Sequence, residues 1–214
     1  MVARLMRGAL LLSCTVAAGC GSGEQDSSAT TLAPESYAAM REYASVSDGL
    51  GDELYGVDKA RTLCERITGE PGSEVATIRS SCALLVSAAE SVEALERCQR
   101  EAATDLDKRK CGADLLEQLA AVAMDDAALA QKLSGQAGLG SGPCLSYLTE
   151  SVQPNRRAAA EFGRIASTLR DRSVSPAELD AAENRLAIEV GRLERLDQGS
   201  ELDRLRVCAP GGSA

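Results

Sequence analysis

The segment that decides the fold is residues 73–98, SEVATIRSSCALLVSAAESVEALERC. Its apolar residues recur every three or four positions, at Val75, Ile78, Cys82, Leu85, Ala89 and Val92. This spacing places them on one narrow face of an α-helix, and such a stripe is typical of a helix that packs along another helix. Ser73 stands just before the stripe, so we expect its hydroxyl to cap the helix N-terminus.

Similar stripes extend through the rest of the chain from residue 36. They comprise Leu115, Leu119, Val122, Leu129 and Leu133; Leu145, Leu148, Val152, Ala159, Phe162, Ala166 and Leu169; and Leu179, Leu186, Val190, Leu193 and Leu196. No stretch alternates β-branched and polar residues as a strand would. The sequence therefore predicts an all-α protein, an antiparallel helical bundle of about five helices.

Glycine and proline mark the expected breaks between helices. Gly49, Gly51 and Gly56 predict that the first helical region, 36–68, consists of two pieces. Residues 134–142 contain four glycines and predict a long flexible joint. Pro154 predicts a kink or break near Val152, because proline lacks a backbone donor and clashes with the preceding turn.

Two further turns carry capping residues. Thr104 to Asp107 can end one helix and cap the next. Ser175 and Glu178 form a capping box, with Pro176 at the first helical position. Residues 36–134 thus provide three helical regions, and residues 143–208 a long hairpin packed on them, within one bundle domain of residues 36–208. We expect residues 209–214 to be a disordered tail.

The first twenty residues have the pattern of an export signal. Arg4 and Arg7 precede an apolar run, 8–18, that is too short to span a bilayer. Ala17-Ala18-Gly19-Cys20 follows, and the segment resembles a bacterial lipoprotein precursor. This resemblance implies a signal peptide of residues 1–19, a lipid on Cys20 and a membrane-anchored, extracytoplasmic protein. Residues 21–35, GSGEQDSSATTLAPE, predict with Cys20 a flexible tether.

Two alternatives to lipid attachment at Cys20 remain. Leu11-Leu12-Ser13-Cys14 is a rival lipidation box, but it would leave an apolar core of only about six residues. The other is a secreted protein cut by an ordinary signal peptidase. In a host with two membranes, Gly21 after the lipidated cysteine resembles the signal for passage to the outer membrane.

Six cysteines remain after Cys14 and Cys20, and an exported protein is expected to oxidise them. Six cysteines allow 15 pairings. Residues that face each other in an antiparallel hairpin are equally far from its turn, and three pairs have midpoints at turns already predicted: Ser73, the Thr104–Asp105 bond and Pro176. We therefore predict the disulfides Cys64–Cys82, Cys98–Cys111 and Cys144–Cys208. The alternative, thiolates that bind copper within a bundle, needs cysteines three or four residues apart on one helix.

Composition excludes several function classes. The chain has 23 basic and 32 acidic residues; loss of Arg4 and Arg7 with the signal peptide changes the net charge from −9 to −11. Such a surface repels nucleic acid. The sequence has no histidine, which excludes Ser-His-Asp and Cys-His pairs and histidine metal sites. We expect no metal and no cofactor.

Three other motifs admit a functional and a structural interpretation. Gly138 to Gly142 could suggest a phosphate loop, but no Gly-Lys-Ser/Thr follows, so we interpret it as a connector. Asp105, Asp107 and Arg109 imitate a calcium loop, but Lys110 and Leu116 replace its glycine and glutamate, so we interpret the aspartates as helix caps. Lys108-Arg109-Lys110 is too short for a polybasic patch.

Acidic residues provide the last candidates. We interpret Asp125-Asp126 as the solvated face of a helix, with paired acid catalysis as the alternative. A mixed-charge stripe is interpreted as a second solvated face, with a docking surface as the alternative; it comprises Arg185, Glu189, Arg192, Glu194 and Arg195.

Together these features favour a non-catalytic envelope protein that binds another protein or a structural polymer. The alternatives are a small-molecule binder or sensor, with the ligand between helices, and an enzyme that uses carboxylates. An enclosed pocket of several hundred Å³ would favour the binder.

Overall fold

The computed structural model describes residues 31–135, 142–196 and 200–210 of the 214-residue chain. Within these ranges all regular elements are helical. Five helices have eighteen or more residues: α2 (Pro34–Gly51), α4 (Glu74–Glu101), α5 (Asp105–Ser134), α7 (Val152–Arg170) and α8 (Pro176–Leu196). The shorter ones are α3 (Val57–Glu65), α6 (Pro143–Glu150), α9 (Glu201–Arg204) and the 3₁₀ turn η1 (Leu205–Cys208). The predicted all-α class is confirmed.

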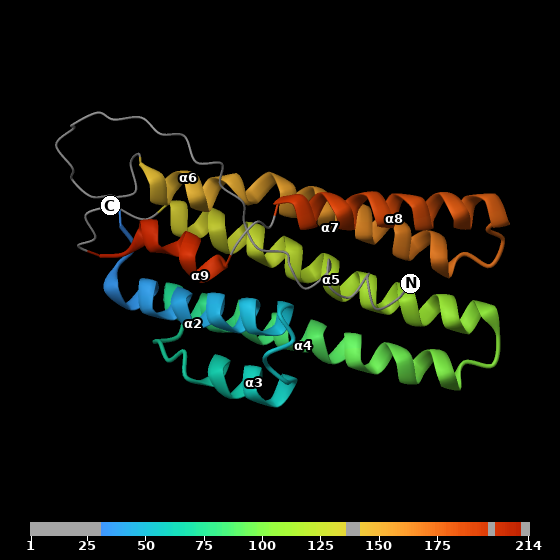
Figure 1. The fold of residues 1–214 in the computed structure, drawn as a ribbon, viewed down its shortest axis with the longest axis horizontal. Coiled ribbons are helices and arrows are strands. Elements are labelled where there is room, and N and C mark those ends of the chain that lie inside the picture. Colours follow the sequence, from blue (N-terminus) through green and yellow to red (C-terminus); the bar gives the residue numbers. More distant parts are fainter. Residues whose placement is uncertain (1–30, 136–141, 197–199, 211–214) are drawn as a thin grey trace.

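The bundle is built around an antiparallel hairpin of α4 and α5 (Figure 1). Helix α7 packs along α5 on the side away from α4, and α8 packs on α7. The predicted packing of 143–208 on 36–134 is therefore confirmed. Helices α2, α3, α6 and α9 all lie toward one end of the hairpin, which therefore has more layers than the end that carries the α4–α5 and α7–α8 turns (Figure 1).

The core contains many alanines and few aromatic residues. Ala88 on α4, Ala113 and Ala123 on α5 and Ala158 on α7 are each 0% exposed. Small side chains let helix backbones approach closely, so these helices pack without bulky residues between them. The stripe of residues 75–92 is buried along its whole length, as predicted, with exposed fractions of 8% or less.

Helix α4 also has the length and apolarity of a membrane span, with a mean hydropathy of 1.2 in its most apolar window. Half of that window is buried inside the fold. Its apolar face contacts α2, α3 and α5, so packing within the bundle accounts for its composition.

The predicted caps are confirmed. Ser73 Oγ accepts a hydrogen bond from Ala76 N at 3.2 Å, and Thr104 Oγ1 accepts one from Asp107 N at 3.1 Å. Ser175 Oγ accepts from Glu178 N at 3.3 Å, while Glu178 Oε2 accepts from Ser175 N at 2.8 Å. These bonds satisfy helix N–H groups that have no partner within the helix.

Two of the three predicted breaks lie wholly within the described residues, and both are confirmed. Helix α2 ends at Gly51 and α3 begins at Val57; between them the ring of Tyr55 packs on Gly49, where no Cβ would fit. Helix α6 ends at Glu150 and α7 begins at Val152, two residues before Pro154. A proline in the first turn of a helix removes no internal hydrogen bond, so the chain restarts its helix there.

The predicted tether is too long at its C-terminal end. Leu32 is 1% exposed and its N–H donates to the Cys208 carbonyl at 3.2 Å, and α2 already begins at Pro34. Because residues 21–35 are mostly polar, their composition does not predict that Leu32 is buried. The signal peptide, Cys20, most of the tether, the glycine joint from 136 to 141, residues 211–214 and the side chains of Leu193 and Leu196 lie outside the described residues.

Candidate functional site

All three predicted disulfides are present: Cys64–Cys82, Cys98–Cys111 and Cys144–Cys208. Their Cα atoms are 5.5, 5.9 and 4.7 Å apart, within the range that an unstrained disulfide spans. Each bond closes the hairpin whose turn lies at its midpoint, because antiparallel helices keep equidistant residues opposite each other. The predicted lipid attachment residue, Cys20, lies outside the described residues.

A C-terminal strap, residues 200–208, folds back onto the N-terminal helix. Asp48 on α2 accepts hydrogen bonds from Ser200 Oγ at 2.5 Å, Glu201 N at 2.9 Å and Leu202 N at 3.1 Å. The first N–H groups of a helix have no partner within it, so this carboxylate caps α9 from another helix. At its other end the strap is held by the Cys144–Cys208 bond to α6.

The strap encloses a cluster of polar groups in the bundle, which we call the carboxyl cluster: Tyr43, Asp126, Tyr147 and Glu201. Tyr43 on α2 donates to Asp126 Oδ1 on α5, and Tyr147 on α6 donates to Glu201 Oε1 on α9 at 3.3 Å. Tyr43, Tyr147 and Glu201 are 4%, 1% and 3% exposed. Four helices thus each contribute one side chain to this cluster, in which Tyr43, Tyr147 and Glu201 are buried and Asp126 is partly buried.

Asp126 is the group that this environment perturbs most clearly. Burial raises its pKa to about 8, while the hydrogen bond from Tyr43 lowers it and the charges of Glu201 and Asp125 raise it. Removing a carboxylate from water penalises its charged form, and here that effect exceeds the stabilisation by the tyrosine. Asp126 therefore holds its proton at neutral pH.

A small cavity lies beside these groups. It is lined by all four residues of the carboxyl cluster and by Met40, Leu129, Ala130, Leu133 and Leu148. Its volume of about 20 Å³ has room for about one water molecule. A pocket that encloses a small organic ligand is more than ten times larger. In chemical terms the site can hold a proton and a water molecule.

The interpretation of Asp125-Asp126 as a solvated face is wrong. Both residues are partly buried; Asp126 bonds to Tyr43, and Asp125 Oδ2 is a buried atom without a hydrogen-bond partner. Helix α5 packs against α4 on one side and against α6 and α7 on the other, so more than one of its faces is covered. Polar residues inside an otherwise apolar stretch were the available signal, but the helices that cover them are distant in sequence.

The mixed-charge stripe on α8 is also not uniformly solvated. Glu189 is only 2% exposed; it accepts from Arg192 Nε at 3.1 Å and faces Arg157 Nε of α7 at 3.7 Å. A buried carboxylate requires such partners. Arg192 also donates to the Pro154 carbonyl at 3.4 Å, which ties α8 to the start of α7. Arg185 is exposed as predicted, and the side chains of Glu194 and Arg195 lie outside the described residues.

The interpretation of Asp105 and Asp107 as part of a helix N-terminus is supported, but the N-cap itself is Thr104. Both lie in the first turn of α5, where a calcium loop would have no helix. Asp107 accepts from Thr104 Oγ1 at 2.7 Å, and this hydrogen bond lowers the pKa of its carboxyl. Within the described residues, no three or more histidine, cysteine or acidic side chains come together as metal ligands would. Of residues 138–142, only Gly142 is described; it is the N-cap of α6.

Comparison of the chain with protein-family models, curated proteins and solved structures finds no match. The fold and cluster define it as a disulfide-stapled all-α bundle with a buried carboxyl cluster. Its three disulfides indicate an oxidising, extracytoplasmic environment.

Proposed function

We infer that this protein is a lipid-anchored, non-catalytic binding module of the cell envelope. Cys20 and the polar segment behind it support the anchor. In this proposal the lipid holds the chain at a membrane and the bundle presents its outer surface to another protein or envelope polymer.

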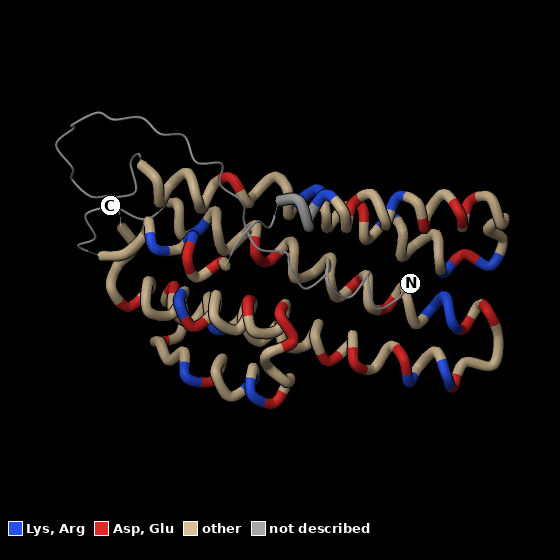
Figure 2. The backbone as a smooth tube through the Cα atoms, in the orientation of Figure 1, with Lys and Arg blue, Asp and Glu red and all other residues tan. Residues whose placement is uncertain are grey.

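The observation that carries the binding role is a scaffold stapled by three disulfides, in which the cavity at the carboxyl cluster is small. Each of the three predicted hairpins has its own disulfide, and the cavity at the carboxyl cluster has room for about one water molecule. A preorganised surface loses little conformational entropy on binding, so a rigid bundle is suited to binding a partner on its outer surface. Asp and Glu are spread along the helices, with Lys and Arg among them near the α4–α5 turn (Figure 2). A surface of this kind suits a partner that complements charge.

Asp126 favours one further candidate, an enzyme that uses carboxylates. A carboxyl group with a pKa of about 8 next to a second acid is the type of group that acts as a general acid. Against this role, Asp126 is bonded to Tyr43 and faces a water-sized cavity. The raised pKa is therefore better explained by its enclosed position in the bundle.

The anchor is tested by membrane fractionation of the wild type and of Cys20→Ser. We expect the wild type in the membrane fraction and the variant in the soluble fraction, because acyl chains provide about 0.8 kcal/mol per buried methylene. Cys14→Ser is the matched control and should leave the wild-type distribution unchanged. Equal partitioning of wild type and Cys20→Ser would contradict the lipid anchor.

The binding role is tested by chemical cross-linking in intact envelopes, followed by mass spectrometry. We expect a reproducible partner whose links to this chain map to exposed residues, and equal recovery with Asp126→Asn. If the same cross-links form with protein that was reduced and unfolded before the cross-linking step, recognition by the folded surface is contradicted. Loss of a measured turnover in Asp126→Asn, with partner binding intact, would instead establish the enzyme.

A further inference from the structure

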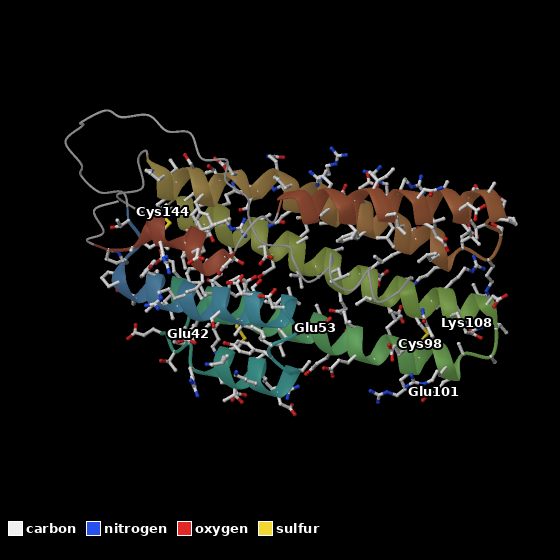
Figure 3. The ribbon with its side chains drawn as sticks, in the orientation of Figure 1. Glu42, Glu53, Cys98, Glu101, Lys108 and Cys144 are labelled. Carbon is white, nitrogen blue, oxygen red and sulfur yellow. A yellow bond between two sulfur atoms is a disulfide. The ribbon has the colours of Figure 1, made fainter. Side chains whose placement is uncertain are left out.

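The three disulfides differ in how far solvent reaches them. Cys64 and Cys82 are 4% and 0% exposed, and Cys144 and Cys208 are both 0% exposed. In the third bond Cys111 is 6% exposed, but Cys98 is an exposed residue in the last turns of α4. Figure 3 shows Cys98 toward the end of the bundle that carries Glu101 and Lys108, far from Cys144. Of the three bonds, Cys98–Cys111 is therefore the one whose cysteine residue is most open to solvent in the folded protein.

The three disulfides also differ in what they hold in place. Cys144–Cys208 fastens the strap, and Cys64–Cys82 fastens α3, an element of nine residues. Such short elements bury little surface of their own. Cys98–Cys111 instead joins α4 and α5, helices of 28 and 30 residues that pack along their length. The buried side chains of this hairpin pack along its whole length, so we expect it to stay folded when the bond is open.

We propose that Cys98–Cys111 is a thiol–disulfide exchange site, opened and closed in the folded protein by a dithiol protein of the thioredoxin type. Two observations carry this proposal: Cys98 is the most exposed of the six disulfide cysteines, and its bond joins the two longest described helices. A purely structural disulfide gains nothing from an exposed sulfur, whereas exchange requires one. The site lies at the opposite end of the bundle from the carboxyl cluster and does not involve it (Figures 1 and 3).

The exchange proceeds in two balanced steps. A thiolate of the dithiol attacks Cys98 Sγ and forms a mixed disulfide, while the Cys98–Cys111 bond breaks and its electron pair leaves with Cys111 Sγ, which takes a proton from water. The second thiolate of the dithiol then attacks the mixed disulfide and releases Cys98 as a thiolate. Two electrons have passed to this chain, and the dithiol has become a disulfide. The reverse sequence, with an oxidised dithiol protein, closes the bond again.

Positive charge beside the bond assists the first step. Lys108 lies one helical turn before Cys111 on α5, and Lys110 precedes Cys111 directly. Both lysines are partly exposed, and their ion pairs with Asp105 and Asp107 are 3.7 and 3.4 Å long. A nearby ammonium group stabilises a departing thiolate and so favours release of Cys111.

The test uses the oxidised, folded protein and a thioredoxin whose resolving cysteine has been replaced by serine, so that mixed disulfides accumulate. Adducts are trapped with an alkylating reagent and located by peptide mapping, while far-UV circular dichroism follows the fold. We expect the adduct at Cys98, formed at least about tenfold faster than at the four cysteines of the other bonds, which require local unfolding. The helical signal should not change. Equal rates at the three bonds, a first adduct at Cys111, or loss of helix during the reaction would each overturn the proposal.

Two further variants test predictions that solvent accessibility alone does not make. The double variant Cys98→Ser, Cys111→Ser should keep its helical signal and lose the fast adduct; failure to fold would overturn the proposal, since the bond would then be structurally necessary. Lys108→Gln should slow the adduct at Cys98 about two- to threefold, because one ammonium near the leaving sulfur is lost. Lys132→Gln, at the other end of α5, is the matched control and should react like the wild type. Equal effects of the two lysine variants would remove the role of Lys108.

Discussion

Asp126 is expected to make the stability of this protein fall as the pH rises. Its pKa is about 8 in the fold, against an ordinary value of 3.8. Between these two values the folded protein keeps a proton that the unfolded chain has released, so each pH unit favours unfolding by about 1.4 kcal/mol. The contribution of Asp126 to the free energy of unfolding is therefore greatest below about pH 4, and it is lost as the pH rises through about 8.

The perturbation that isolates this effect is Asp126→Asn. The amide is a neutral isostere of the protonated acid, and its oxygen can still accept the hydrogen bond from Tyr43. At pH 7 the unfolded aspartate is about three pH units above its pKa, so the variant should be more stable than the wild type by about 4 kcal/mol. Near pH 4 the two proteins should have similar free energies of unfolding.

The assay is urea unfolding, followed by circular dichroism, with the disulfides intact and the pH varied from 4 to 8.5. Asp180→Asn, which changes an exposed residue of α8, is the matched control and should follow the wild type at every pH. The groups that face Asp126 are Tyr43, Tyr147, Glu201 and its neighbour Asp125. All four are present in both proteins, so the difference between the curves reports the proton held at Asp126 and its coupling to them.

Parallel curves for the wild type and Asp126→Asn between pH 4.5 and 7.5 would refute this reasoning. They would mean that Asp126 is ionised in the fold at neutral pH and that water reaches the carboxyl cluster. A variant that is less stable at pH 7 would have the same consequence.

Three further changes test the elements that close the bundle. Asp48→Ala should cost about 1–3 kcal/mol, because it leaves Ser200 and two backbone N–H groups without their acceptor, and should speed hydrogen exchange in residues 200–208 selectively; unchanged exchange there would contradict the capping role. Ser175→Ala should cost about 1 kcal/mol in urea unfolding by removing the capping box of α8. Replacing Cys144 and Cys208 together by alanine should cost about 4 kcal/mol, since the closed loop of 64 residues restricts the unfolded chain; a loss below about 1 kcal/mol would show that the strap is held mainly by its hydrogen bonds.

Local features of the sequence determined the helices and the disulfides. The caps at Ser73, Thr104 and Ser175 and the break before Pro154 depend on residues within one or two turns, and the structure has each of them. The three disulfides followed from the same turns, because an antiparallel hairpin fixes which residues face each other.

Only the tertiary structure decided which polar residues are buried. Asp126 and Glu189 have the spacing of exposed helix residues, but α2, α6 and the strap cover the first, and α7 covers the second. Leu32 was hidden in a polar segment, and Asp48 caps residues more than 150 positions away. Helix periodicity records one apolar face, which is a local property. Which further faces become covered depends on contacts between segments that are distant in sequence. Those contacts bury Asp126, which raises its pKa, and they leave Cys98 exposed to solvent.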